Sequence, residues 1–334
     1  MSTSRLHRFD RRGFLAGASA LGAASFLGVH RPASAEPPPE TSRIRLADGP
    51  FLCFAPLYLA EDLLRLEGFR DIEYIRDETG IDTDTGDLVI YGGPAILPVI
   101  DTGGPWVVLA GLHVGCWELM GNDRVRSVGD LKGKAVATGA IRSVEYLWIT
   151  SILAYIGMDA RTDVEWIETG SIAESQRLFL QGKVDAFLAF PPQPQEVRLR
   201  KFGHTLVHTT FDRPWSQYFC CMVAMRQEFV RKFPIATKRA LRAMLKAADI
   251  CAAEPERVAR YLAKRGFEPR YEIGVEVLRD LPYDRWRTDN PEDTLRFHAL
   301  RLHDVGMIKS TPQQIIARGT DWRFLNELKR ELKA

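Results

Sequence analysis

Short apolar runs alternate with amphipathic segments in the first part of the chain. The apolar runs predict strands, and the amphipathic segments between them predict helices. Strands are expected at residues 43–47, 71–76, 88–91 and 106–112, and helices at 55–66 and 95–101. In the helix at 55–66, leucines recur at positions 57, 59, 63, 64 and 66. The strand–helix–strand order predicts a parallel α/β sheet.

The same order begins again after Asp130-Leu131-Lys132-Gly133-Lys134. Strands are expected at residues 135–138, 164–167, 184–190 and 205–208, with helices at 143–156, 171–181 and 193–201. Beyond Met225 the pattern is mostly helical, at 227–233, 235–253, 255–265, 271–281, 291–305, 312–317 and 322–332. The pattern therefore predicts two α/β units followed by a helical C-terminal tail.

Two α/β units in one chain favour two lobes. We assign residues 43–112 and 225–334 to lobe 1 and residues 123–212 to lobe 2. Residues 113–122 and 213–224 are then the two crossings between the lobes. Ligands of such folds bind at the carboxyl ends of the strands, so the site is expected in the cleft between the lobes.

The first 35 residues have the anatomy of an export signal. A basic stretch ends in Arg11-Arg12-Gly13-Phe14-Leu15, an apolar stretch runs to Val29, and small residues follow at Ala33-Ser34-Ala35. The arginine pair is similar to the twin-arginine signal, although Asp10 stands where Ser or Thr is usual. We predict cleavage before Glu36, a Pro-rich spacer at 36–42 and a periplasmic location; the alternative is an uncleaved N-terminal anchor.

Charge, cysteine content and the motif search argue against several classes of function and site. The formal net charge is +2, but removing residues 1–35 leaves 40 basic and 42 acidic residues. No long basic run and no interleaving of basic and aromatic residues is present, which argues against a nucleic-acid partner. The five cysteines are odd in number and their spacing suggests no disulfide framework. We also find no phosphate-binding loop, no His-Glu-x-x-His and no Gly-x-Ser-x-Gly.

Several stretches carry a family resemblance. They are Ala55–Ala60, Gly93–Ala95 leading to Ile100–Gly103, Leu109–Leu119, Ser127–Lys134 running on to Ile152–Asp159, and Gly182–Phe187. Together they resemble the substrate-binding proteins of ABC importers of the nitrate/sulfonate/taurine type, a group that is similar to the proteins that bind or make the thiamine pyrimidine. The resemblance covers most of residues 43–250.

The resemblance implies a two-lobed, type II periplasmic-binding fold with a helical C-terminal tail. It implies a monomer without cofactor or metal that passes a small anion, a sulfonate or a nitrogen heterocycle to a membrane permease and its ATPase. Two alternatives stay open: an enzyme of the pyrimidine-synthesis kind on the same fold, and a sensory protein that presents its ligand to a membrane receptor.

The loop before the helix at 143–156 is the first candidate for ligand contact. Gly139, Arg142 and Ser143 stand at the helix N-terminus, where free N–H groups and a partial positive charge suit an anion. The family often has Gly and Ser in succession there, and this chain has Gly139-Ala140-Ile141-Arg142-Ser143. The sequence therefore leaves open which chemical group binds here.

Aromatic residues and the crossings supply the other candidates. Phe51, Phe54 and Tyr58 follow the first predicted strand, and Gly93 would let a backbone approach closely. The crossings add His113, Cys116, Glu118, Trp215 and Tyr218. Strand alternation places Cys116 and Glu118 on one face and His113 on the other, which argues against a shared metal ion. Ordinary core or hinge packing is the alternative for the aromatic residues, and no catalytic residue is predicted.

Overall fold

The computed structural model describes residues 36–49, 51–76 and 86–333. Residues 39–334 form one compact unit, which is the unit described below. The predicted export signal at residues 1–35 lies outside the described residues. No described helix combines the length and the apolar character needed to cross a membrane.

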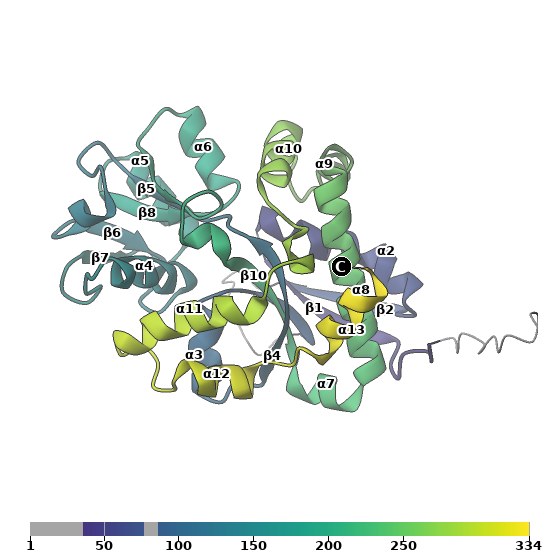
Figure 1. Cartoon of the computed structure of the whole chain (residues 1–334). Coiled ribbons are helices and arrows are strands. Elements are labelled where there is room, and N and C mark those ends of the chain that lie inside the picture. The colour runs from purple at the N-terminus through teal and green to yellow at the C-terminus, as the bar shows by residue number, and fades with distance from the viewer. Residues whose placement is uncertain (1–35, 50, 77–85, 334) are drawn as a thin grey trace, which may run out of the picture. The chain divides into compact units, whose positions relative to one another are not determined.

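The first sheet has five strands in the order β2-β1-β3-β10-β4 (Figure 1). The strands are β1 (Arg43–Asp48), β2 (Asp71–Arg76), β3 (Leu88–Gly92), β4 (Trp106–Val114) and β10 (Phe219–Arg226). Strands β2 and β3 pair with β1 in parallel, whereas β10 pairs antiparallel with both β3 and β4. A strand from late in the chain therefore completes the sheet built by the first residues.

The second sheet repeats this arrangement, in the order β7-β6-β8-β5-β9. Its strands are β5 (Glu118–Gly121), β6 (Ala135–Thr138), β7 (Glu165–Glu168), β8 (Ala186–Ala189) and β9 (His204–His208). Strand β6 pairs in parallel with β7 and β8, and β5 runs antiparallel to β8 and β9. Both sheets are thus mixed rather than parallel, and the expected parallel sheet is corrected in this respect. In each, the antiparallel strand is the one that follows a passage from the other sheet.

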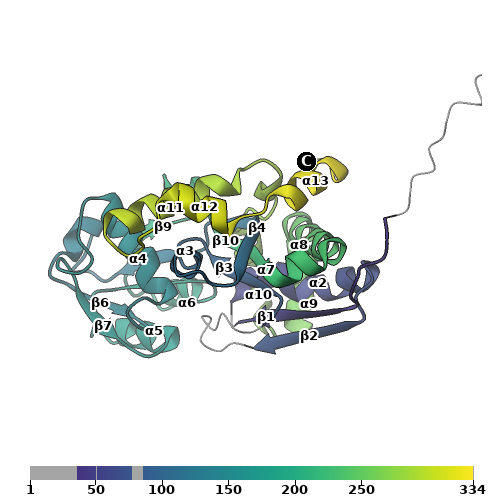
Figure 2. The same cartoon turned by 90° about the horizontal axis from the view of Figure 1, so that it is seen from below.

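Helices cover both sheets (Figures 1 and 2). The α-helices are α2 (Ala55–Leu66), α3 (Ile96–Asp101), α4 (Val144–Tyr155), α5 (Ile172–Leu180), α6 (Gln193–Leu199), α7 (Gln227–Lys232), α8 (Pro234–Ala253), α9 (Pro255–Lys264), α10 (Tyr271–Asp280), α11 (Pro291–Asp304), α12 (Pro312–Gly319) and α13 (Arg323–Glu331). Short 3₁₀ helices are η1 (Leu52–Phe54), η2 (Val128–Leu131), η3 (Trp215–Gln217) and η4 (Arg285–Arg287).

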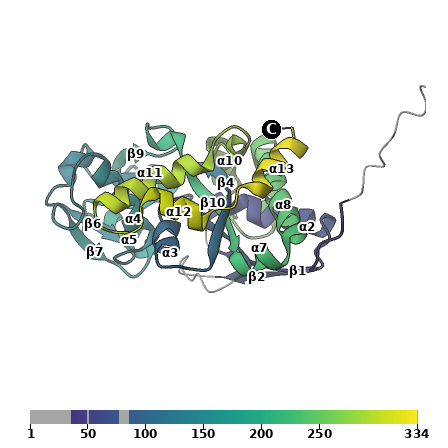
Figure 3. The ribbon, with the colours of Figure 1, turned by 60° about the horizontal axis from the view of Figure 1, so that its bottom comes forward.

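The C-terminal helices pack mainly on the first sheet. Helices α8, α12 and α13 contact β4, and α8 also contacts α2. Helix α11 instead packs along α4, which belongs to the second sheet's half, and Figure 3 shows α11, α12 and α13 lying along one side. Helix α4 lies between β8 and α11, and the first ten of its twelve residues, Val144 to Leu153, are all buried. Two covered faces explain why its sequence is mostly apolar and has no polar face over these residues.

The passages between the sheets are shorter than the predicted crossings. Residues 118–121 form β5 and residues 219–224 belong to β10, so the connecting residues are 115–117 and 209–218. In the first passage Gly115 and Cys116 have φ angles of 70° and 114°. A left-handed backbone ends the extended strand, so side chains beyond Val114 no longer alternate as they do along β4.

Candidate functional site

A pocket of about 550 Å³ opens at the carboxyl ends of β6, β7 and β8. It is lined by Phe51, Gly139, Ala140, Ser143, Glu145, Gly170, Ser171, Ile172, Ala173, Gln176, Phe190, Pro192, Gln193 and Glu196. All of these except Phe51 come from the second sheet's half, and Phe51 follows β1 of the first sheet. The pocket therefore lies where the two halves meet, as ligand sites of open α/β sheets do.

The N-terminus of α4 forms one wall. Ser143 is its N-cap, and the Ser143 hydroxyl accepts a hydrogen bond from the Tyr146 N–H at 3.3 Å. The hydroxyls of Thr138 and Ser143 are hydrogen-bonded at 2.9 Å, which ties the end of β6 to the start of the helix. The turn between them is held in place on both sides, so it presents a fixed surface to the pocket.

Glu145 brings a carboxyl group into this wall. Its side chain is 3% exposed, and its Oε1 has no hydrogen-bond partner among the described residues. Burial raises the pKa of Glu145, against the opposing effect of hydrogen bonds from its own backbone N–H, from the Ser143 side chain and from the Gly139 backbone. A Cβ atom at Gly139 would lie 3.1 Å from this Oε1, so the glycine leaves room for the carboxyl group. A buried carboxyl oxygen without a partner is costly, which points to a missing donor.

Aromatic rings form another part of the wall. Phe51 and Phe190 have ring centroids 4.5 Å apart, and both are more than nine-tenths buried. The backbone also joins the halves here, since the Leu52 N–H donates to the Pro191 carbonyl at 3.4 Å. Trp117 packs edge-on against Phe190 with centroids 5.0 Å apart. The rings give the pocket an apolar wall of the kind that holds a flat or apolar ligand.

Amide side chains and a second glutamate complete the lining. The Gln193 amide donates to the Ile172 carbonyl at 3.2 Å and to Gln176 Oε1 at 3.3 Å. The Gln176 amide donates to Glu196 Oε2 at 2.9 Å. Glu196 is further neutralised by Arg270, 2.6 Å from its Oε1. Of the two lining carboxyl groups, Glu196 therefore forms an ion pair within the protein, and Glu145 forms none among the described residues.

Ion pairs beside the pocket connect the two halves. Arg198 on α6 lies 3.2 Å from Glu276 on α10, and Glu196 on α6 pairs with Arg270 just before α10. Helix α10 packs on η1, α8 and α9, which belong to the first sheet's half. Because these groups are about half exposed, each pair contributes little to stability alone. Together they connect α6, which carries the lining residue Glu196, to the first sheet's half.

The charge of the lining restricts what it can hold. None of the described residues that line the pocket is basic. An anionic ligand would meet the Glu145 carboxyl group without a counter-charge, which costs free energy in a buried site. A ligand that donates hydrogen bonds, or that carries a positive charge, would instead supply the partner that Glu145 Oε1 lacks.

Comparisons with known proteins place the fold. The NMT1-like family model matches residues 117–265, and no protein of curated function matches the sequence. The solved periplasmic nitrate-binding protein NrtA from Synechocystis PCC 6803 is similar with a TM-score of 0.73 and 17% identity, over 89% of this chain and 90% of that one. The alkanesulfonate-binding protein SsuA from Xanthomonas axonopodis pv. citri bound to MOPS gives 0.69 and 15%, over 85% and 99%. The chain has the periplasmic-binding-protein fold.

A third similar structure is the aliphatic sulphonate binding protein SsuA from Escherichia coli, with a TM-score of 0.66 and 17% identity over 83% of this chain and 92% of that one. The predicted α/β periplasmic-binding fold with a helical C-terminal region is thereby confirmed. At such low identity the likeness concerns the fold, so the ligand must be argued from this chain's own residues.

Within the periplasmic-binding fold, three of the predicted contact residues line the pocket: Phe51, Gly139 and Ser143. Arg142 is exposed, with a φ of 74°, and is not part of the lining. Phe54 and Tyr58 are buried in the core, where Tyr58 stacks on Phe267 and donates to the Gly49 carbonyl. They pack the first sheet's half.

Other predicted residues also lie outside the pocket. The Gly93 N–H donates to the Cys220 carbonyl at 2.7 Å. Trp215 packs edge-on against Phe297, with centroids 5.4 Å apart, and Tyr218 stacks on the same ring at 3.9 Å. Both aromatic residues therefore contact α11 and not the pocket.

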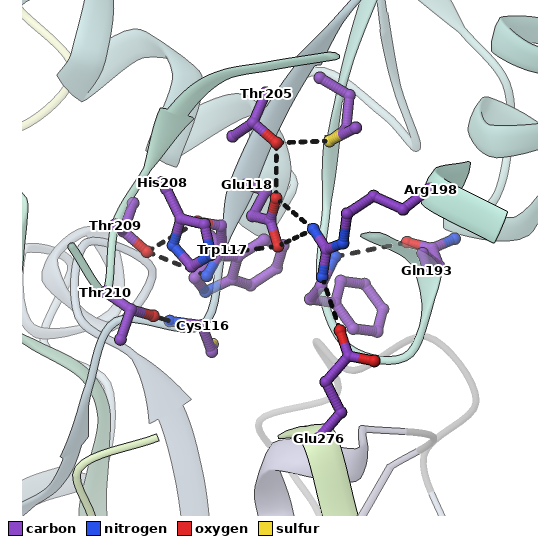
Figure 4. Close-up of polar contacts among 12 residues, drawn as sticks. Cys116, Trp117, Glu118, Gln193, Arg198, Thr205, His208, Thr209, Thr210 and Glu276 are labelled. Carbon is purple, nitrogen blue, oxygen red and sulfur yellow. Dashed lines mark hydrogen bonds and ion pairs between the residues drawn. The ribbon is translucent and has the colours of Figure 1, made fainter. Parts of the chain in front are cut away.

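Glu118 belongs to a polar network next to the passage (Figure 4). Arg198 Nη1 lies 2.8 Å from both Glu118 carboxylate oxygens, and the Thr205 hydroxyl donates to Oε2 at 2.7 Å. His208 Nε2 is 3.3 Å from Oε1. Glu118 is 2% exposed and fully engaged, so its charge is neutralised within the protein. Through Arg198 the same network reaches Glu276 on α10.

The expected separation of His113 and Cys116 is wrong. Strand alternation holds only to Val114, and the left-handed turn at Gly115 and Cys116 redirects the Cys116 side chain. As a result Cys116 lies beside His113, together with Cys53 and Cys221. The argument against a shared metal ion therefore does not hold for this chain.

Several lining residues were missed from the sequence. Glu145 and Gln176 carry much of the polar character of the pocket, and neither was among the predicted contacts. One signal was available: Ser143 and Ser171 begin consecutive helices after parallel strands, so both helix N-termini face the same sheet edge. The residues just after each N-cap were the ones to consider.

Proposed function

We propose that this protein is the solute-binding component of an ABC importer and that its solute is a small, nitrogen-containing molecule that donates hydrogen bonds and has no net negative charge. One observation carries this proposal: Glu145 is buried, and its Oε1 has no hydrogen-bond partner among the described residues. None of the described residues that line the pocket is basic. The Phe51 and Phe190 rings favour a flat molecule. Of the ligand classes expected from the resemblance, a nitrogen heterocycle fits these features best.

Binding would proceed by closure of the two halves on the solute. Phe51 and the Phe190–Pro191 segment already meet across the pocket, and the pairs Arg198–Glu276 and Glu196–Arg270 join the halves at its mouth. Closure of this kind buries the ligand and changes the outer surface. A permease with its cytoplasmic ATPase would read that change. A periplasmic location and export by the arginine pair are part of the same proposal.

We further propose that the pocket binds its solute without chemical conversion. The ionisable groups of its described lining are Glu145 and Glu196, and Glu196 is held by Arg270 and Gln176. That leaves one carboxyl group without a second acid–base group beside it in the described lining. The Ser143 hydroxyl next to it caps α4 and is hydrogen-bonded to the Thr138 hydroxyl, so it is engaged in holding the turn. A single acceptor suits recognition of a donor group.

A ligand screen by thermal shift tests the proposal. Aminopyrimidines and other nitrogen heterocycles, linear amines, nitrate, alkanesulfonates and carboxylates are each added to the purified protein. A ligand at about 100 times its dissociation constant should stabilise the protein by about 2.7 kcal/mol. We expect stabilisation by a heterocycle or amine and none by the anions. Stabilisation by nitrate or a sulfonate alone would overturn the assignment of the ligand class.

A further inference from the structure

Away from the pocket, four potential metal ligands converge at the passage between the sheets. Cys53 comes from η1, His113 from the end of β4, Cys116 from residues 115–117 and Cys221 from β10. One ligand atom from each, three sulfurs and one imidazole nitrogen, lies within 4.8 Å of every other. Residues far apart in the sequence thus supply one compact group of donors.

The backbone fixes this convergence. Cys221 stands directly opposite His113 in the register of β10 and β4. Gly115 lies against Thr210, and a Cβ there would come within 2.3 Å of Thr210 atoms, so only glycine allows the turn. The Cys116 N–H then donates to the Thr210 hydroxyl at 3.1 Å (Figure 4). The backbone of the first passage therefore fixes the position of Cys116.

The four potential ligands are buried, and the His113 ring has a nitrogen without a hydrogen-bond partner among the described residues. His113 is 0% exposed, and Cys53, Cys116 and Cys221 are at most 3% exposed. His113 Nε2 has no hydrogen-bond partner among the described residues. Tyr283 lies edge-on to the His113 ring with centroids 5.1 Å apart, and its hydroxyl donates to the Cys53 carbonyl at 3.0 Å. Such outer contacts orient ligands in metal sites.

We propose that Cys53, His113, Cys116 and Cys221 bind one zinc ion as a closed, four-coordinate site. Three thiolates and one imidazole are a common ligand set of structural zinc, with Zn–S bonds of about 2.3 Å. A tetrahedron with such bonds places its sulfurs about 3.8 Å apart, so the donors need to approach one another by at most about 1 Å. The four protein ligands leave no open position, so the ion is structural.

The zinc ion joins three separate parts of the fold. It connects the segment after β1, the passage out of β4 and strand β10. Those segments meet where the chain crosses from one sheet to the other, so the ion stiffens the base of the crossing. Because the ligands are not part of the pocket lining, zinc binding is independent of the proposed solute.

A disulfide is the competing use of these sulfurs. Cys116 and Cys220 have their sulfurs 2.8 Å apart, whereas the Cys220 and Cys221 sulfurs are 3.9 Å apart. Oxidation of Cys116 with Cys220 would remove one of the four zinc ligands. The metal ion is favoured because it uses all four converging donors, whereas a Cys116–Cys220 disulfide would use only one of them.

The test uses the full chain, purified with a reductant and freed of metal. One equivalent of Zn²⁺ is added, excess is removed, and zinc is counted by mass spectrometry; Co²⁺ is added in a parallel sample. We expect about one zinc per chain and the visible absorption of a tetrahedral cobalt thiolate. Cys221→Ser should lose most of the bound zinc. Cys251→Ser is the matched control, because Cys251 is buried but lies outside the cluster.

Each outcome of this experiment either supports or overturns the zinc site. Zinc in the wild type and in Cys251→Ser, with loss in Cys221→Ser, supports the site. Retention of zinc in Cys221→Ser overturns it. If Cys221→Ser fails to fold by circular dichroism, the wild-type cobalt spectrum decides: thiolate bands support the site and their absence overturns it. A reduced wild type that takes up neither metal, while the untreated protein carries a Cys116–Cys220 disulfide, also overturns it.

Discussion

Glu145→Gln is the substitution that tests the pocket most directly. Glutamine keeps the length and shape of the side chain and removes its negative charge. Glu145 is 3% exposed, its Oε1 has no hydrogen-bond partner among the described residues, and burial raises its pKa. We expect the variant to bind the solute more weakly and, without solute, to be at least as stable as the wild type.

The magnitude follows from the type of contact. A hydrogen bond to a charged group contributes about 1.5–3 kcal/mol, which corresponds to roughly 10- to 150-fold in the dissociation constant. The effect on stability has the opposite sign. Because burial raises the pKa of Glu145 above its value in the unfolded chain, the folded state holds this proton more tightly. The resulting contribution to stability is present below the ordinary pKa and lost as the pH rises through the raised value.

Titration calorimetry with a ligand from the screen, and denaturant melts without ligand, measure the two effects. The affinity of the wild type should fall on acidification as Glu145 becomes protonated, whereas that of Glu145→Gln should not change with it. Glu165→Gln is the control, since Glu165 is an exposed residue on β7 of the same sheet. Unchanged affinity in Glu145→Gln, with the control also unchanged, would refute the assignment of Glu145 as the ligand's acceptor.

Three further variants test other parts of the chain. Burial lowers the pKa of His298 from 6.5 to about 3. Below about pH 6.5 the imidazole is therefore protonated in the unfolded chain but stays neutral in the folded protein. Between roughly pH 7.5 and 5 this should remove about 2 kcal/mol from the free energy of unfolding. Denaturant melts of His298→Asn should lack that part of the loss, with His303→Asn on the same helix as control, and an unchanged loss would contradict the burial argument. Trp215→Ala should cost about 3–5 kcal/mol of stability because the ring is buried against Phe297, while solute affinity stays near the wild-type value; a selective loss of affinity in titration would return Trp215 to the site. Arg11-Arg12→Lys-Lys should hold the protein in the cytoplasm on cell fractionation, and export at the wild-type level would show that the arginine pair is not the signal.

The candidate site was predictable in part. The strand–helix boundary at Gly139 and Ser143 follows from local sequence, because a turn glycine and a capping serine stand just before an apolar helix. The prediction that an anion binds at this helix N-terminus took no account of the Glu145 side chain. Whether its carboxyl group points to solvent or into the pocket depends on the packing of α4 between β8 and α11. That packing involves residues about 150 positions apart in the chain, which local patterns do not contain.

Sequence periodicity by itself determined most helices, most strands, the break between two α/β units and the helical C-terminal part, because those features depend on contacts along the chain. Tertiary structure alone decided which strands pair. Strands β5 and β10 each enter a sheet as the antiparallel member, and nothing in their own residues specifies that partner. It also decided which side chains meet. Cys53, His113, Cys116 and Cys221 converge because a left-handed turn at Gly115 ends one strand and strand pairing brings another beside it. Contacts of this kind depend on the positions of distant backbone segments in space, and these exist only once the chain has folded.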